Sequence, residues 1–485
     1  MDRKDALEYV KKIFDIIEIE GVLIPENSPV INFKHPHELL DGLLDLNLGE
    51  PTRSKENFLQ EIKKIINYSV KTCHKHFYNQ LYGGVDLYGF AGTLLAESLN
   101  TNQHTFEVSP VFTLIEQEVI KKFANVVGYK NYDGIFCPGG SIANMYGIML
   151  ARYLKYPEIK EKGLFGCKKL IIFVSEEGHY SITKSANWLG FGTENVKKIK
   201  TDKNGRMCVK DLEENILNCS ESEDKLVVIA TAGTTIYGAI DPIDKIQEIC
   251  KQYNIWMHVD ASYGGILLLS KNHKSKLKNI QNVDSLVWNS HKMLGVPLQC
   301  SLFLTKHSNL LMDCNSASAK YLFQSDKMYD TSFDTGDKSI QCGRKVDAFK
   351  LWTTWKLRGD QGLEKLVDTA VDCSNYFKNS IQNKEGFRLI NENVDTTSIC
   401  FFYIPKILRN VTEDDEWKLK LNLVAPSIKS KLVLSGDLMI SYTPMASKGL
   451  CNFFRLVVTC HPPRNYEDMD YIIEQIENVG EKFTL

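Results

Sequence analysis

The chain contains the stretch Ser285-Leu286-Val287-Trp288-Asn289-Ser290-His291-Lys292, an apolar run followed by a polar segment that ends in a lysine. Upstream, Asn254–Val259 leads directly into Asp260-Ala261-Ser262 in the same manner. Both apolar runs have the length and composition of buried strands. An aspartate after one strand and a lysine after the next are therefore expected at the same edge of a parallel sheet.

Strands and helices alternate between residues 56 and 360, which predicts a large α/β domain with a mostly parallel sheet. In one unit, Leu226–Ala230 is an expected strand, Asp241-Pro242 is expected to cap and start a helix, and Ile255–Val259 is the next expected strand. Residues 1–55 are predicted to form an N-terminal helical lead-in. Residues 361–485 are predicted to form a smaller α+β C-terminal domain, with strands at 398–404, 438–442 and 452–460.

Composition is that of an ordinary globular protein and argues against several partner classes. The 485 residues are 43% hydrophobic and 24% charged, and 58 Lys and Arg against 60 Asp and Glu leave a net charge of −2. This balance gives no reason to expect nucleic acid or an acidic membrane as a partner. The Met1–Ala6 segment lacks the apolar run of a signal peptide, and no stretch has the length and apolarity of a membrane span. Thirteen cysteines without regular spacing predict reduced thiols and a cytoplasmic location.

The ends of the expected strands carry the candidate chemistry. Burial should lower the pKa of Lys292 toward the neutral amine that attacks carbonyls, and Asp260 is suited to pair with a protonated ring nitrogen. Pyridoxal phosphate needs both groups. His179 follows the expected strand at 170–174 and Thr231 follows the one at 226–230, so all four side chains are expected in one crevice. Taken singly, each has an ordinary structural alternative, such as a surface lysine or a histidine satisfied within the core.

A glycine-rich turn supplies a candidate phosphate cradle. Cys137-Pro138-Gly139-Gly140-Ser141 precedes an expected helix whose apolar face includes Ile142 and Met145. Backbone N–H groups and the positive end of the helix dipole at such a start favour a bound phosphate. The motif alone is equally typical of a simple turn and helix cap.

A series of motifs along the chain matches one known family. The motifs are Asn79-Gln80-Leu81, Phe136–Ser141, Ala230–Thr235, His258-Val259-Asp260, His291-Lys292-Met293, Tyr321–Gln324, Asp334–Lys338 and Asn452–Arg455. From about Phe77 to the C-terminus, the chain resembles the pyridoxal-phosphate-dependent decarboxylases of the group containing the glutamate, cysteine sulfinate and aspartate enzymes. The resemblance implies a fold-type I (aspartate-aminotransferase-like) α/β architecture with a mostly parallel seven-stranded sheet and a small α+β C-terminal domain. It also implies a homodimer with active sites at the interface.

The resemblance implies a role for each matched residue. Lys292 is expected to hold the cofactor covalently, with Asp260 on the ring nitrogen and His179 stacked on the ring. Tyr321 is the expected proton donor, on a mobile segment that closes over the site, and the region from Tyr321 to Cys342 is expected to reach the neighbouring subunit's site. The other cofactor-binding residues implied are Gly140, Ser141, Thr231, Ser262, Asn289, His291 and Cys342, and the substrate-binding residues implied are Gln80, Leu81, Tyr82 and Arg455.

The chain departs from the family pattern at several positions. Ser290 stands where the family usually has proline, Tyr263 where it usually has tryptophan, and His74–Tyr78 replaces the usual His-Pro-Arg-Phe-Phe. These changes leave the reactive groups intact, so they bear on substrate preference and loop rigidity. Cys73 and the nearby histidines match no zinc pattern, and no metal is expected.

The expected substrate is a small acidic amino acid, because Arg455 offers a planar fork suited to carboxylate or sulfinate. Asn315–Gln324 and Gly343–Lys350 resemble the cysteine sulfinate and aspartate decarboxylases, and the ring of Tyr82 would shorten the pocket. Ala232–Gly238 and residues 100–102 resemble the glutamate enzymes instead. The sequence favours cysteine sulfinate, giving hypotaurine, or aspartate, giving β-alanine. Glutamate, giving GABA, is the alternative.

Two other functions compete with decarboxylation. An aminotransferase or sulfur lyase would share Lys292 and Asp260, but it does not account for the segment from Tyr321 to Lys338. A catalytically inactive paralogue acting as a binding partner is opposed by the intact Lys292, Asp260 and His179.

Overall fold

The computed structural model describes residues 2–25, 28–49 and 54–484. Contacts divide the chain into two compact units: Asp86–Val371 with Asn391–Ser398, and Met1–Val85 with Asp372–Ile390 and Ile399–Leu485. The limits predicted from the sequence, at 55 and 360, differ from this division. Residues 56–85 cluster with the C-terminal part of the chain, and the second limit lies inside one long helix, α12 (Asp347–Gln382).

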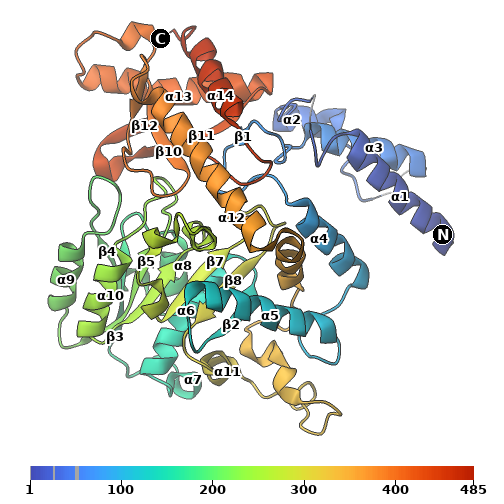
Figure 1. The fold of residues 1–485 in the computed structure, drawn as a ribbon, viewed down its shortest axis with the longest axis vertical. Coiled ribbons are helices and arrows are strands. Elements are labelled where there is room, and N and C mark those ends of the chain that lie inside the picture. The colour runs from blue at the N-terminus through green and yellow to red at the C-terminus, as the bar shows by residue number, and fades with distance from the viewer. Residues whose placement is uncertain (1, 26–27, 50–53, 485) are drawn as a thin grey trace. The chain divides into compact units, whose positions relative to one another are not determined.

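The larger unit is built on a seven-stranded sheet with the order β2-β8-β7-β6-β5-β3-β4, drawn cyan to yellow in Figure 1. Strands β4, β3, β5, β6 and β7 pair in parallel, and only β8 pairs antiparallel with its neighbours β7 and β2. The predicted mostly parallel sheet is confirmed. The strands are β2 (Asp133–Cys137), β3 (Lys169–Ser175), β4 (Val196–Ile199), β5 (Glu223–Thr231), β6 (Trp256–Asp260), β7 (Ser285–Asn289) and β8 (Ser301–Thr305).

Helices cover this sheet, as its apolar strands require, because β6 and β7 are buried along their whole length. Helix α6 packs against β2, β5, β6, β7 and β8, and α10 packs against β5 and β6. The helices are α4 (Leu87–Leu99), α5 (Pro110–Val127), α6 (Gly140–Lys155), α7 (Ile159–Lys162), α8 (Ser181–Trp188), α9 (Val209–Leu217), α10 (Ile243–Gln252) and α11 (Leu310–Asn315).

One predicted cap is wrong. Helix α10 begins after Pro242, and no side chain caps it. The Asp241 carboxylate instead accepts hydrogen bonds from the backbone N–H of Met207 and of Thr231, each at 2.7 Å. Burial raises the pKa of Asp241 to about 7 although both hydrogen bonds lower it. Asp241 therefore braces the end of β5 rather than the start of the helix.

The smaller unit contains a five-stranded sheet with the order β1-β11-β12-β10-β9. Helix α13 packs against β11, β12 and α14. The strands are β1 (Phe77–Tyr78), β9 (Phe387–Leu389), β10 (Ser398–Tyr403), β11 (Met439–Met445) and β12 (Leu450–Val457). The helices are α1 (Arg3–Ile19), α2 (Pro36–Glu38), α3 (Lys55–Tyr68), α13 (Asp415–Ser435) and α14 (Tyr466–Gly480). Among the described helices of the chain, none combines the length and the apolar character needed to cross a membrane.

Candidate active site

The carboxyl ends of the parallel strands meet in one pocket of the larger unit. Thr231 ends β5, Asp260 ends β6 and Asn289 ends β7, while α6 starts at Gly140 directly after β2. The pocket has a volume of about 230 Å³. Its lining is Gly140, Ser141, Asn144, His179, Tyr180, Thr231, Gly233, Thr235, Asp260, Ser262, Asn289, His291 and Lys292. Nine of the ten predicted cofactor-binding residues are therefore brought together.

Lys292 and Asp260 shift each other's pKa. Burial lowers the pKa of the Lys292 amine, and the Asp260 carboxylate offsets part of that shift. Burial raises the pKa of Asp260, but the Lys292 charge and hydrogen bonds from Ser262 and Asn144 outweigh it, so the net shift is downward. At neutral pH the site therefore holds an ionised carboxylate beside an amine whose neutral form is easier to reach.

Asn144 is a site residue that sequence reasoning missed. Its Nδ2 donates to Oδ2 of Asp260 at 2.8 Å, and the backbone N–H of Ser262 donates to Oδ1 at 3.1 Å. Asn144 lies three residues after Ser141 on α6, the spacing that places two side chains on one helix face. That spacing from a predicted phosphate-binding residue was the available signal. Tyr180, Gly233 and Thr235 also line the pocket without having been predicted.

His179 is oriented by the residues that follow it. Its Nδ1 lies 2.8 Å from Oγ of Ser181 and accepts the Ser181 backbone N–H at 3.2 Å. Burial lowers the pKa of His179, although the Asp260 carboxylate pulls it upward. The imidazole is therefore neutral near pH 7, which suits a ring that stacks on a flat ligand.

The start of α6 forms the expected cradle. Gly139 has φ +93°, a conformation that side chains disfavour. A Cβ on Gly140 would lie 2.6 Å from Nδ2 of Asn289 and 2.9 Å from Oγ of Ser262, so only glycine lets the helix start approach these groups. Oδ1 of Asn289 and Oγ1 of Thr231 are buried and have no hydrogen-bond partner within the described chain.

Tyr321 and Cys342 lie outside this pocket. The Tyr321 side chain is 78% exposed, and Cys342 is also exposed. Neither lines the pocket in the single chain. Their expected roles depend on a second copy of the chain and stay predictions.

The predicted substrate residues lie together in the smaller unit. Arg455 on β12 is 9% exposed, and its Nη2 donates to the carbonyl oxygen of Asn79 at 3.1 Å, directly before Gln80. Its Nε donates to Oγ of Ser441 at 3.0 Å. Leu81 and Tyr82 follow on the same loop and are half-buried. The guanidinium is thus held next to the predicted segment.

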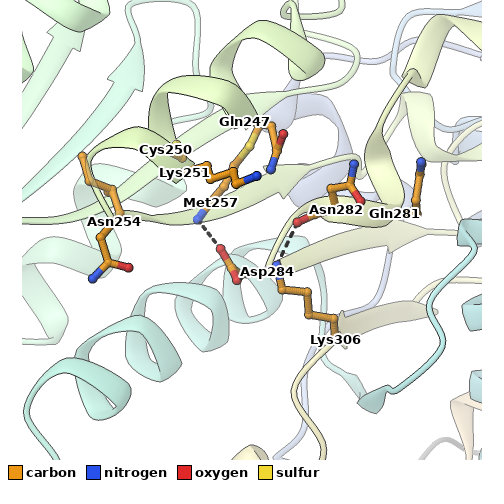
Figure 2. Close-up of a pocket in the computed structure, with 10 residues that line it drawn as sticks. Gln247, Cys250, Lys251, Asn254, Met257, Gln281, Asn282, Asp284 and Lys306 are labelled. Atoms are coloured by element: carbon orange, nitrogen blue, oxygen red, sulfur yellow. Dashed lines mark hydrogen bonds and ion pairs between the residues drawn. The ribbon is translucent and has the colours of Figure 1, made fainter.

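A larger cavity of about 550 Å³ lies at the opposite ends of the same strands. Figure 2 shows Lys306 and Asp284 among its lining residues, with Lys306 bonded to the Asn282 carbonyl oxygen at 2.8 Å. Lys306 also pairs with Asp284 at 2.9 Å. None of the ten described residues that line it has a buried polar side-chain atom without a partner. The strand-end pocket differs, because Oδ1 of Asn289 and Oγ1 of Thr231 are buried there without a partner in the described chain.

Comparison with known proteins decides the family. A family model described as the pyridoxal-dependent decarboxylase conserved domain matches residues 36–404. The chain belongs to the pyridoxal-dependent decarboxylases. Among its relatives, this decarboxylase is 44% identical to the cysteine sulfinic acid decarboxylase of Mus musculus over 476 residues, which cover 97% of this chain and 96% of that protein. It is 46% identical to the acidic amino acid decarboxylase GADL1 of Homo sapiens over 483 residues, covering 99% and 92%.

The fold comparison agrees. A crystal structure of mouse CSAD superposes on the decarboxylase with a TM-score of 0.95 at 42% identity, covering the whole of both chains. The predicted fold-type I class, enzyme class and cofactor are confirmed.

The pocket residues fit pyridoxal phosphate. The glycine start of α6 leaves backbone N–H groups for a phosphate, and Asn289 and Thr231 offer buried polar atoms that lack partners. Asp260 is an ionised acceptor for a ring nitrogen, and Lys292 is the amine for the aldehyde. Among the described residues, no group of three or more His, Cys, Asp or Glu is arranged to hold a metal ion.

Proposed function

We propose that this decarboxylase acts on a small acidic amino acid, converting cysteine sulfinate to hypotaurine, aspartate to β-alanine, or both. The observation that carries the proposal is near-full-length similarity to relatives named for cysteine sulfinic acid and for acidic amino acids. The alternative is glutamate, which would give GABA. One methylene in a pocket is worth about 1–3 kcal/mol, so few side chains are needed to select between these acids.

The pocket residues have separate proposed roles toward pyridoxal phosphate. When bound, pyridoxal phosphate supplies an electron sink for the pair left as carbon dioxide departs. Lys292 would provide the amine that holds the aldehyde of the cofactor. Asp260, whose pKa is lowered, would pair as a carboxylate with the protonated ring nitrogen, and His179 would stack on the ring. Gly140, Ser141, Asn289 and His291 hold the phosphate, while Thr231 and Ser262 line the ring.

Arg455 is the proposed anchor for the side-chain acid of the substrate. Its hydrogen bonds to Ser441 and to the Asn79 carbonyl fix the guanidinium before any ligand arrives. A fixed planar fork binds carboxylate or sulfinate at low entropic cost. Gln80 and Leu81 would line the same site, and the Tyr82 ring would limit the length of the acid.

The proposed active unit is a homodimer. Helix α4 exposes Leu94 (36%), Leu95 (49%) and Leu99 (55%), an apolar face that a second copy would cover. The same copy would receive the segment that carries Tyr321, the proposed proton donor to the substrate carbon, and Cys342. Mixing inactive Lys292→Ala chains with Tyr321→Phe chains should restore activity, because one mixed site then has both groups. Absence of complementation in mixtures that form heterodimers would contradict this arrangement.

The proposed location is the cytoplasm. All thirteen cysteines are free, including the exposed Cys342, which suits a reducing compartment.

The substrate proposal is tested by measuring kcat/KM for cysteine sulfinate, aspartate and glutamate with the purified holoenzyme, with an aromatic amino acid as control. Cysteine sulfinate or aspartate should exceed glutamate by at least about tenfold. A tenfold preference for glutamate would refute the short-pocket argument from Tyr82. A preference for the aromatic acid would refute the role of Arg455.

A further inference from the structure

Behind Asp260 lies a line of buried hydrogen bonds that the roles above leave unused. Asn144 on α6 donates to Asp260, and its Oδ1 lies 3.0 Å from Nε2 of His258. Nδ1 of His258 lies 2.8 Å from Oγ of Ser285, which also accepts Nε1–H of Trp256 at 3.0 Å. Asn144 is 1% exposed, and His258 and Ser285 are fully buried. No solvent therefore competes for these bonds.

The line has one consistent arrangement of protons at neutral pH. Ser285 accepts from Trp256, so its single hydroxyl proton is left for Nδ1 of His258. Burial lowers the pKa of His258 to about 4, so the ring is neutral and carries its proton on Nε2. Nε2–H then donates to Oδ1 of Asn144. The amide NH₂ of Asn144 must face Asp260, because the flipped amide would set its oxygen against the carboxylate.

The second amide proton of Asn144 extends the line to the other side of the pocket. Nδ2 donates to Oγ of Ser181 at 3.1 Å, which leaves the Ser181 hydroxyl proton for Nδ1 of His179. His179 then carries its own proton on Nε2. The Asn144 amide therefore bonds directly to Asp260, the proposed partner of the cofactor's ring nitrogen. It also orients the His179 imidazole through the Ser181 hydroxyl.

Packing fixes the imidazole that orients this amide. A Cβ on Gly147 of α6 would lie 2.5 Å from Nδ1 of His258, so the helix backbone leaves room for the ring and nothing larger. His258 is thus shielded from solvent and packed directly against the backbone of α6.

We propose that Asn144, oriented by the neutral ring of His258, is the positioning residue that holds Asp260 as an ionised acceptor and His179 in a single tautomer. The inference rests on the proposed roles of Asp260 and His179 toward the cofactor. It extends the site to Asn144 and to His258, which does not line the pocket.

Two variants of His258 separate hydrogen bonding from packing. His258→Gln keeps a donor that reaches Oδ1 of Asn144, whereas His258→Leu fills similar space without one. Each holoenzyme is compared with wild type by the dissociation constant of pyridoxal phosphate and by the visible circular dichroism of the bound cofactor, which reports ring orientation. His258→Leu frees the Asn144 amide and so weakens its hydrogen bond to the charged Asp260. Cofactor binding should then weaken by about 10- to 100-fold, and the dichroism should change. The dissociation constant of pyridoxal phosphate for His258→Gln should stay within about threefold of the wild-type value.

Further variants guard against a folding defect. Asn144→Ala should reproduce His258→Leu, and the double variant should be no worse than either alone, because both break the same link. His273→Leu, where Nε2 of His273 lies 3.6 Å from Asp368 and outside this line of hydrogen bonds, should leave both readouts unchanged. Equal losses in His258→Gln and His258→Leu, additive losses in the double variant, or unchanged readouts in His258→Leu would each overturn the inference. A wild-type chain that forms no visible band with pyridoxal phosphate would instead overturn the proposed function beneath it.

Discussion

Acid should destabilise the folded chain through His258 by an amount that the structure sets. Burial lowers the pKa of this imidazole from 6.5 to about 4, with Asp260 offsetting part of the shift. The unfolded chain protonates the same side chain near 6.5, so between these values it binds a proton that the folded chain excludes. The stability is therefore fully present above pH 6.5 and is lost progressively as the pH falls toward 4.

The size of this loss follows from the pKa difference. At about 1.36 kcal/mol per pKa unit, lowering the pH from about 7 to about 4.5 should cost about 2.5 kcal/mol through His258 alone. His258→Gln removes the titrating group, so its free energy of unfolding should fall by that much less over the same interval. Urea unfolding of the two apoproteins, measured at a series of pH values, gives both curves. Parallel curves would refute the reasoning, because they would mean that the folded chain accepts a proton on His258 as easily as the unfolded chain.

Three further outcomes follow from the site. Lys292→Ala should bind pyridoxal phosphate without the visible Schiff-base band and lose decarboxylation; a persisting band would assign the cofactor to another lysine. Gly140→Ala should weaken cofactor binding by at least about tenfold, because its Cβ would lie 2.6 Å from Asn289, and an unchanged dissociation constant would contradict the cradle. Arg455→Gln should lower kcat/KM for acidic substrates by about 100-fold. Arg455→Lys should give an intermediate value, because lysine keeps the charge without the planar fork. Equal kcat/KM values for the two variants would contradict the proposed anchoring role of Arg455.

The convergence of His179, Thr231, Asp260 and Lys292 followed from the sequence for a simple reason. Each follows a short apolar strand, and parallel strands bring their carboxyl ends to one edge whatever the loops do. The phosphate cradle at the start of α6 was also predictable locally, because two glycines and a serine before an expected helix indicate free backbone N–H groups. These residues were predictable because secondary structure alone determines their side of the sheet.

The remaining residues depend on contacts between distant segments. Asn144 bonds Asp260 because α6 packs against β6. Its spacing from Ser141 indicates the helix face but not the bonding partner, which depends on that packing. Asp241 has the residue type and position of a helix cap, yet the turn after β5 brings it back to the Thr231 backbone, where it is buried. The predicted limit at 55 does not coincide with the division by contacts, because β1 is two residues long and pairs with β11 (Met439–Met445).

That pairing has a consequence for the order in which the protein is made. Phe77 and Tyr78 align in parallel with Met439 and Ile440, so β1 cannot pair until residues 439 and 440 have left the ribosome. The larger unit, by contrast, is almost continuous from Asp86 to Val371 and has most of its partners available earlier. During translation the N-terminal segment would thus be an unpaired edge that chaperones can bind. Truncation late in the chain should release this early segment from its sheet while leaving the pyridoxal pocket's own strands intact.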